Sequence, residues 1–460
     1  MSTVSIKNDS FKREWKTLKA VWKLTIVLGV LLALAVLFAP GVAADSAGTA
    51  AAAVTDTMNT VDMLWVALAC CLVFIMAPGI ALFYGGMLRK QSMTSCIVQC
   101  TAAMAVVGFV WIAVGYSLAF SGSGLVVGNL SALLLNGVSA DGSTLGYTVP
   151  DLEFMLFQGM FALVTACIVL GAVAERVRFP AIMAFLALWS VLVYAPMAHM
   201  VWGGGLLSTA GGYLTTLDYA GGTVVHICSG ISGVAAAVVL GKRSANTQKF
   251  RSHNVPAVFL GATMLWVGWI GFNGGSGLAV NGQLISVIAV TLVSSFVSTI
   301  VWSLIQYVHV GRIGATGICA GMLAGLVGIT PACGYVTVPA ACIIGAVAAC
   351  VCYGGVIFMR QKSGVDDALD VFGIHGLGGV WGAIATGIFA SQYTDTGGLI
   401  TGSTALFCGQ LAAVGFTLVY CFVISFIIMK VLSKVMRVRL SPAEEQIGAD
   451  IVEHGEPAYV

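Results

Sequence analysis

Long apolar runs alternate with short polar connections from residue 61 almost to the C-terminus. Each run is long enough for one helix to cross a hydrocarbon core about 30 Å thick. The pattern predicts an all-α polytopic membrane protein. It predicts eleven transmembrane helices, at 61–86, 94–120, 153–175, 179–203, 221–241, 256–278, 284–308, 314–330, 337–359, 371–390 and 403–433.

The distribution of positive charge tests this count, because short cytoplasmic loops keep an excess of Lys and Arg. Beyond residue 44, the Lys and Arg residues occupy alternate connections or the end of the last run and the segment after it. If one helix had been miscounted, the Lys and Arg residues would be distributed over both sides of the membrane. We therefore expect the first of these helices to start outside and the C-terminus to lie in the cytoplasm.

The first 44 residues have a different pattern, in which a basic stretch precedes a short apolar run and then small residues. This order is typical of a secretory signal. We predict a cleaved signal peptide at 1–44, a short external leader at 45–60, an eleven-helix transporter domain at 61–435 and a cytoplasmic regulatory tail at 436–460. The alternative is a retained twelfth helix, which would leave every loop on the same side.

Composition narrows the class further. Apolar residues make up 59% of the chain and charged residues 9%, far from the usage of soluble globular proteins. The net charge of +2 gives no indication of a nucleic-acid partner. All thirteen cysteines except Cys333 fall within the predicted helices, so we expect packing residues rather than disulfides or a metal site. We therefore expect no cofactor.

Two histidines lie inside these apolar runs, and the same sparse pattern surrounds both. Each has Asp eight residues before it, Gly four after and Gly seven after. An ionisable ring inside a lipid-spanning helix usually faces the bundle interior and serves a transport or proton pathway. The two sets are Asp218, His226, Gly230 and Gly233, and Asp367, His375, Gly379 and Gly382.

The histidines fall in the fifth and tenth predicted helices. An odd number of crossings per repeat inverts the second copy, so we predict two inverted five-helix repeats plus a final helix. Eight residues of helix rise about 12 Å. The two rings would therefore lie at similar depth from opposite faces, where they could touch, and the following glycines would let the two helices approach closely.

Three interpretations of the histidine pair remain open at this point. Two neutral rings can hydrogen-bond each other and still line a pore. Both could instead ligate a metal or haem, which would give the purified protein a Soret band. They could also be ordinary core histidines.

Several segments carry a resemblance to a known family. Residues 218–226 (DYAGGTVVH) and 370–376 (DVFGIHG) closely resemble the twin-histidine helices of ammonium transporters, the Amt/Rh family. The match extends over about 400 residues and is closest to the bacterial Amt type. Further similar segments are 79–87 (GIALFYGGM), 157–161 (FQGMF), 174–180 (AERVRFP), 199–205 (HMVWGGG), 268–276 (GWIGFNGGS) and 330–335 (TPACGY).

The resemblance implies an external recruitment site for ammonium formed by Phe161, Trp202 and Ser276. The chemistry of these residues agrees, because an aromatic face attracts a small cation by roughly 0.5 to 2 kcal/mol and a hydroxyl can accept one of its hydrogen bonds. Asp218 would lie near this entry. Because Asp favours helix N-termini, we weigh capping of the fifth helix equally with direct attraction of the ion.

The resemblance further implies that Phe161 and Phe272 close the pore and that His226 and His375 line the narrow channel beyond. Ammonium would lose a proton at the outer side, and ammonia would then cross the membrane, either together with that proton or without it. Methylammonium would be carried as an analogue. The implied assembly is a homotrimer with one pore per subunit in the bacterial inner membrane. This is a transport function rather than an enzymatic one, and an ammonium sensor with little flux is the alternative.

The charged C-terminal segment contrasts with the apolar bundle, and we expect it to be exposed. It resembles the family tail that docks across the inner face of the trimer and responds to PII-type nitrogen regulators. The alternative is a disordered charged terminus. The tail residues singled out by the resemblance are Asp450, His454, Gly455 and Tyr459.

Overall fold

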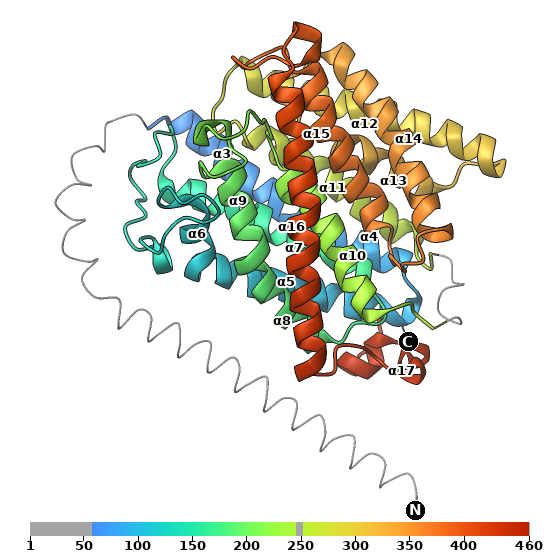
Figure 1. Ribbon diagram of the computed structural model, residues 1–460. Coiled ribbons are helices and arrows are strands. Elements are labelled where there is room, and N and C mark those ends of the chain that lie inside the picture. Colours follow the sequence, from blue (N-terminus) through green and yellow to red (C-terminus); the bar gives the residue numbers. More distant parts are fainter. Residues whose placement is uncertain (1–57, 245–251, 460) are drawn as a thin grey trace, which may run out of the picture. The chain divides into compact units, whose positions relative to one another are not determined.

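The computed structural model describes residues 58–244 and 252–459. The expected signal peptide and nearly all of the expected leader lie outside the described residues. Within these ranges the chain is helical and forms no strand, apart from one isolated bridge between Val177 and Arg439. Figure 1 shows the long helices packed side by side, with α16 running the full height of the bundle.

The helices follow one another along the chain in two halves and a final span. The first half contains α3 (Thr60–Phe74), α4 (Met76–Met87), α5 (Met93–Val110), α6 (Tyr116–Phe120), α7 (Asp151–Val173), α8 (Phe179–Trp189), α9 (Ala195–Trp202) and α10 (Cys228–Leu240). The remainder contains α11 (Val255–Gly275), α12 (Gly282–Val310), α13 (Ala315–Ile329), α14 (Val338–Gln361), α15 (Leu377–Phe389), α16 (Ala405–Val435) and α17 (Pro442–Ile447).

Local sequence explains where several of these helices begin and end. The side chains of Asn254, Asn281 and Thr337 accept hydrogen bonds from backbone N–H groups in the first turns of α11, α12 and α14. Such N-cap residues satisfy donors that have no partner inside the helix. Helix α12 ends at Gly311, whose φ of 73° lies in the left-handed region that glycine adopts without strain.

The observed helices agree with the predicted ones to within a few residues, but the structure does not confirm the count of eleven spans. Among the described residues, ten helical segments are long and apolar enough to cross a membrane. The remaining predicted span, 314–330, is the apolar helix Ala315–Ile329 of 15 residues. At about 1.5 Å per residue it is about 22 Å long, because the chain turns at Thr330 instead of continuing.

Both histidine-bearing helices begin with a wider, π-helical turn. The first turn, Gly222–Ile227, leads into α10, and the second, Phe372–Gly376, leads into α15. Each contains its histidine. Such turns are rare and occur often at functional sites. The repeated Asp–His–Gly–Gly pattern is therefore accompanied by the same local backbone in both copies.

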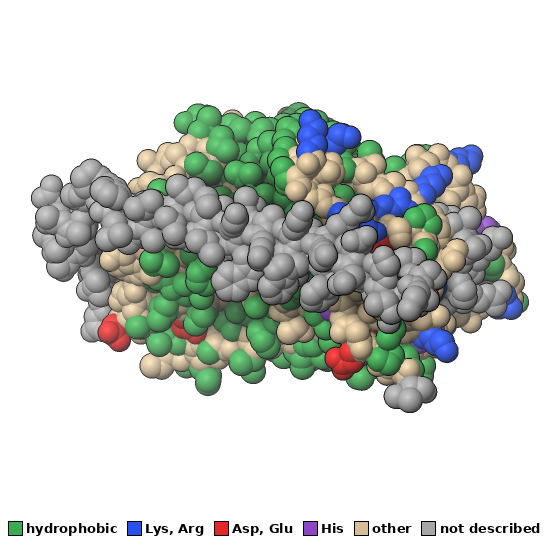
Figure 2. All heavy atoms as spheres, turned by 90° about the horizontal axis from the view of Figure 1, so that it is seen from below, with side chains coloured by type: hydrophobic (Ala, Val, Ile, Leu, Met, Phe, Trp, Pro, Cys, Tyr) green, Lys and Arg blue, Asp and Glu red, His purple; other side chains and the backbone are tan. Residues whose placement is uncertain are grey.

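The two ends of the bundle differ in charge. One end, called here the basic end, carries Arg89, Arg176, Arg243 and Arg360 together with the C-terminal segment after α16. Figure 2 views the molecule from below, the side on which α17 lies in Figure 1, and shows several Lys and Arg side chains on the described surface. The opposite end consists of the other connections, including the loop after α9 that leads to Asp218.

Candidate functional site

The two histidines meet inside the bundle, as their spacing predicted. Their Nδ1 atoms are 3.2 Å apart and their ring centroids 5.3 Å apart. His226 is fully buried and His375 is 8% exposed. One Nδ1 must donate and the other accept, so two neutral rings in this pair are opposite tautomers. The Nε2 atom of His226 has no partner in the described structure.

Glycines allow the two histidine-bearing helices to approach this closely. A Cβ atom added at Gly230 would lie 2.5 Å from the backbone nitrogen of Gly376. A Cβ atom added at Gly379 would lie 2.8 Å from the carbonyl oxygen of Gly222. Both neighbours are backbone atoms that cannot rotate away, so the crossing depends on the absence of side chains.

Asp218 acts as a cap at the start of its helix. One carboxylate oxygen accepts hydrogen bonds from the backbone N–H groups of Gly221 and Gly222, at 2.8 and 2.6 Å. The other accepts from the backbone N–H of Thr223 at 2.7 Å and from the Thr223 hydroxyl. These bonds support the capping interpretation, because each satisfies a donor at a helix N-terminus.

A continuous series of aromatic rings leads from the opposite end towards His226. The ring centroids of Trp202 and Phe161 are 6.0 Å apart, and those of Phe161 and Phe272 are 4.2 Å apart. Phe272 stacks on His226 at 6.0 Å. Phe161 and Phe272 are 1% and 0% exposed, so both rings are packed in the interior between Trp202 and His226.

Trp202 and Ser276 are held by backbone groups near the mouth of this series. The indole nitrogen of Trp202 donates to the carbonyl oxygen of Asp218 at 2.8 Å. The Ser276 hydroxyl donates to the carbonyl oxygen of Phe272 at 2.8 Å. Its lone pairs therefore remain available as acceptors. A ring contact joins Trp202 to Phe161, whereas the Ser276 hydroxyl bonds within its own helix.

Sequence reasoning missed Trp269. Its ring stacks on His226 with centroids 5.4 Å apart and an interplanar angle of 21°, and its indole nitrogen donates to the Thr330 hydroxyl at 2.8 Å. Trp269 lies three residues before Phe272, a spacing that places both on one helical face. That spacing is the signal that could have identified it.

Beyond Phe272 the two histidines line a narrow, almost wholly apolar cavity. Its free volume is about 10 Å³, which is room for about one water-sized molecule. No carboxylate lines it. The lining consists of Met76, Ile80, Phe83, Tyr84, Val164, Ile168, His226, Leu265, Trp269, Phe272, Leu323 and His375.

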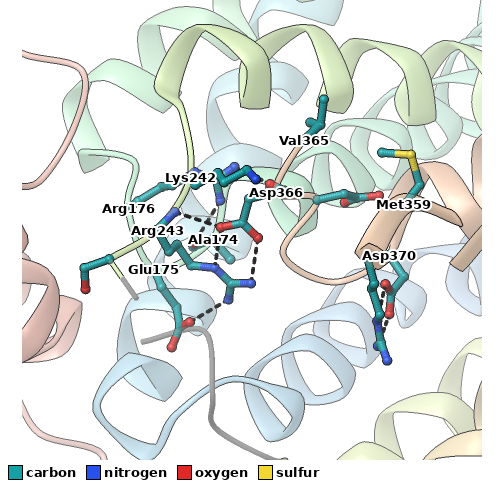
Figure 3. A network of polar contacts seen from close by, with 12 residues as sticks. Ala174, Glu175, Arg176, Lys242, Arg243, Met359, Val365, Asp366 and Asp370 are labelled. Atoms are coloured by element: carbon teal, nitrogen blue, oxygen red, sulfur yellow. Dashed lines mark hydrogen bonds and ion pairs between the residues drawn. The ribbon is translucent and has the colours of Figure 1, made fainter. Parts of the chain in front are cut away.

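A much wider cavity of about 870 Å³ opens at the basic end. Its wall contains a network of ion pairs (Figure 3). Arg243 lies between two carboxylates, 2.8 Å from Glu175 and 2.9 Å from Asp366. Arg89 contacts the same Glu175 at 2.9 Å. The network joins loops that are far apart in the sequence.

The C-terminal tail packs against this end, so the expectation that it is exposed holds for only part of its described residues. Glu445 is fully buried and accepts hydrogen bonds from the Arg439 guanidinium at 2.7 and 2.9 Å and from the backbone N–H of Ser244 at 2.7 Å. Asp450 is 1% exposed and accepts from the backbone N–H of Ser95 at 2.7 Å. These contacts also exclude a disordered tail over the described residues.

The other tail residues singled out by the resemblance take part in the same docking. The His454 ring lies 3.3 Å from the Ser95 hydroxyl, and the Tyr459 hydroxyl lies 2.9 Å from a ring nitrogen of His253. Gly455 has a φ of 69° and ends the π-helical turn Asp450–His454.

Comparison with known proteins decides the family. A profile of the Ammonium Transporter Family matches residues 64–459. The chain belongs to this family. It is 42% identical to an ammonium transporter of Bacillus subtilis over 404 residues, which cover 87% of this chain and 98% of that protein. It is 40% identical to the ammonium transporter Amt1 of Archaeoglobus fulgidus, with 87% and 100% covered.

Solved structures give the same assignment. The crystal structure of Candida albicans Mep2 matches with a TM-score of 0.78 and 36% identity, covering 88% of this chain and 91% of that one. A structure described as Sensor Amt Protein matches with a TM-score of 0.78 and 29% identity, covering 85% and 98%. The resemblance to the Amt/Rh family is confirmed, and this ammonium transporter family member is a membrane protein of a transport family.

Proposed function

We propose that this protein captures ammonium at its outer end and conducts ammonia through the cavity between the two histidines. The observation that carries the proposal is the unbroken series of rings from Trp202 through Phe161 and Phe272 to His226, which ends on a dry cavity with hydrogen-bonding groups. Ammonium is the small cation that both the aromatic entrance and the hydrogen-bonding interior suit.

The cost of burying charge selects ammonia as the species inside. A charged group at the bilayer centre costs between about 2.5 and 17 kcal/mol, and no carboxylate lines this cavity to offset it. Ammonium therefore gives up its proton before it passes Phe161 and Phe272. Trp202 and Ser276 recruit the ion, and His226 and His375 hydrogen-bond the neutral molecule onward. Movement of the proton through the histidine pair would make transport electrogenic, which we favour.

The membrane arrangement follows from the same proposal. The basic end faces the cytoplasm by the positive-inside rule, and α13 completes eleven spans although it is short. The two Asp–His–Gly–Gly helices then belong to inverted five-helix repeats, with α16 as the final span. The assembly is a homotrimer in a bacterial inner membrane, with the predicted signal peptide at 1–44 removed.

The direct test is the current that ammonium evokes in proteoliposomes. We expect a saturable current with ammonium, a smaller one with methylammonium and none with K⁺, because K⁺ carries no proton to release. Protein-free liposomes are the control. Equal currents for ammonium and K⁺ would show conduction of the bare cation and contradict the proposal.

An ammonium sensor is the second candidate, favoured by the structural similarity to the protein described as Sensor Amt Protein. The same experiment separates the two functions. A sensor binds ammonium at the outer aromatic site without carrying a current, so saturable quenching of tryptophan fluorescence with no current would support it.

The docked tail indicates regulation at the inner end. We propose that it forms part of the surface on which a PII-type regulatory protein acts. Its docking depends on Glu445, which neutralises Arg439 while that guanidinium also donates to the carbonyl oxygen of Leu240 at 2.7 Å. The tail is thereby tied to the end of α10, the helix that follows His226.

Removing the Glu445 carboxylate should release the tail. We expect Glu445→Ala to weaken docking by about 1–3 kcal/mol, less than for a fully buried ion pair because Arg439 keeps some access to water. Limited proteolysis of the tail should then be about tenfold faster or more. Glu456→Ala, at an exposed position of the same tail, is the matched control. Equal cleavage rates in the two variants would show that the contact does not hold the tail.

A further inference from the structure

Asp367 occupies the position in the second half that Asp218 occupies in the first, but it is much less completely hydrogen-bonded. Each of its carboxylate oxygens accepts one backbone N–H, from Val371 at 3.0 Å and from Phe372 at 2.7 Å. Both oxygens of Asp218 accept at least two donors. Both residues cap their helices, but the Asp218 carboxylate accepts more hydrogen bonds than the Asp367 carboxylate.

The surroundings of Asp367 also disfavour its negative charge. None of the ion pairs formed among the described residues includes Asp367, whereas its neighbours Asp366 and Asp370 pair with Arg243 and Arg360. Burial and the like charge of Asp370 raise the pKa of the Asp367 carboxyl to about 7. The two backbone N–H bonds and, more weakly, the positive charge of Arg176 lower this pKa but do not cancel the rise. The other titratable and charged groups that interact with it are Tyr84 of α4 and Arg360 of α14.

The location of Asp367 relates it to the pore. It is 7% exposed and lies in the wall of the wide cavity at the basic end, beside Asp370 and Leu369. The chain continues from Asp367 into the π-helical turn Phe372–Gly376, which contains His375 eight residues further on. A small third cavity shares Tyr84 with the narrow cavity and Leu88, Glu175 and Leu369 with the wide one. We infer that a molecule that passes His375 reaches the wide cavity, whose wall includes Asp367, by this route.

We propose that Asp367 is the inner proton donor, at which ammonia becomes ammonium again after it leaves the pore. This inference rests on the proposed function, since it assumes that ammonia arrives without its proton. The protonated carboxyl transfers its proton to the lone pair of ammonia, so an O–H bond breaks and an N–H bond forms. The products are a carboxylate and ammonium. A proton from the inner solution then restores the carboxyl.

The asymmetry between the two aspartates supports this direction. Each oxygen of the outer carboxylate, Asp218, accepts at least two hydrogen bonds at the start of its helix. The inner carboxyl of Asp367 can exist in both forms near neutral pH and can therefore pass on a proton. The adjacent carboxylates differ from Asp367 in having a cationic partner, since Asp366 pairs with Arg243 and Asp370 with Arg360.

Asp367→Asn separates proton transfer from capping, because the Asn side chain keeps an oxygen that accepts the N–H bonds and is itself a good N-cap. Initial methylammonium uptake is measured in right-side-out membrane vesicles, with the lumen buffered between about pH 6 and about pH 8 and the outside held constant. The acid fraction of a group with a pKa of about 7 falls about tenfold over this interval. We expect wild-type uptake to fall several-fold as the lumen becomes alkaline.

In Asp367→Asn the dependence on luminal pH should disappear, with uptake near the slow, alkaline level of the wild type. Asp141→Asn removes an exposed carboxylate at the opposite end and should keep the wild-type profile. An unchanged pH profile in Asp367→Asn would overturn the assignment.

Infrared difference spectroscopy gives a second measurement that needs no flux. A carboxylic-acid C=O band that titrates near neutral pH should be present in the wild type and absent from Asp367→Asn. Absence of such a band from the wild type would also overturn the assignment. If the wild type itself carries no ammonium or methylammonium, the proposed function fails, and the infrared titration still decides whether Asp367 holds a proton near neutrality.

Discussion

Replacing either pore histidine with alanine should reduce the ammonium-evoked current at least about fivefold. Ammonia inside the narrow cavity finds hydrogen-bonding partners almost only on His226 and His375. Leaving one buried hydrogen bond unmade costs about 1–3 kcal/mol, and every 1.4 kcal/mol added to a barrier slows passage about tenfold. His226→Ala also removes the ring that packs between Trp269 and His375.

The measurement compares wild-type protein, His226→Ala and His375→Ala in proteoliposomes at equal protein density. His309→Ala is the matched control, since this exposed ring bonds to the Tyr353 hydroxyl at 2.8 Å and does not line the narrow cavity. We expect it to retain the full current. Undiminished currents in both pore variants would contradict the role proposed for the pair.

His226→Gln keeps hydrogen-bonding groups without an ionisable ring, so it should conduct ammonia but lose any proton-coupled current.

The sequence predicted the helices closely because lipid imposes a strong constraint. Every residue that faces hydrocarbon must be apolar and every backbone group must be paired within a helix, so apolar runs and helices coincide. The predicted run 371–390 and the observed segment Phe372–Phe389 differ by one residue at each end. Helix α13 was placed just as closely, since the predicted run 314–330 becomes Ala315–Ile329, but it is short for a membrane span because the chain turns at Thr330.

The meeting of the two histidines was also predictable, because matched offsets in oppositely directed helices place both rings at the same depth. The π-helical turns around the histidines could not be predicted, because a change of backbone hydrogen-bond register leaves the hydropathy pattern of the sequence unchanged. Docking of the tail was implied by the family resemblance, whereas the composition of the tail pointed to exposure. A segment rich in Glu and Asp indicates solvent exposure, but Glu445 and Asp450 find their partners at Ser244 and Ser95, far away in the sequence.

A valine at Gly230 should separate the histidine-bearing helices and abolish transport. Its Cβ atom alone would lie 2.5 and 2.6 Å from the nitrogen and Cα atoms of Gly376, one residue after His375. Because these are backbone atoms, the whole helix start must move. Inserting bulk into a well-packed interior costs about 1–3 kcal/mol, and the histidine rings would lose their 3.2 Å contact.

Two measurements separate loss of stability from loss of the pore. Thermal unfolding of the purified protein, followed by tryptophan fluorescence, should show a lower midpoint for Gly230→Val, and the ammonium-evoked current of the folded fraction should be lost. Gly415→Val in α16 is the matched control, because a Cβ atom there meets nothing within 4 Å. We expect this control to keep both the midpoint and the current. A normal current from folded Gly230→Val protein would mean that ammonia does not need the close crossing of α10 and α15, and the pore would then have to lie elsewhere in the bundle.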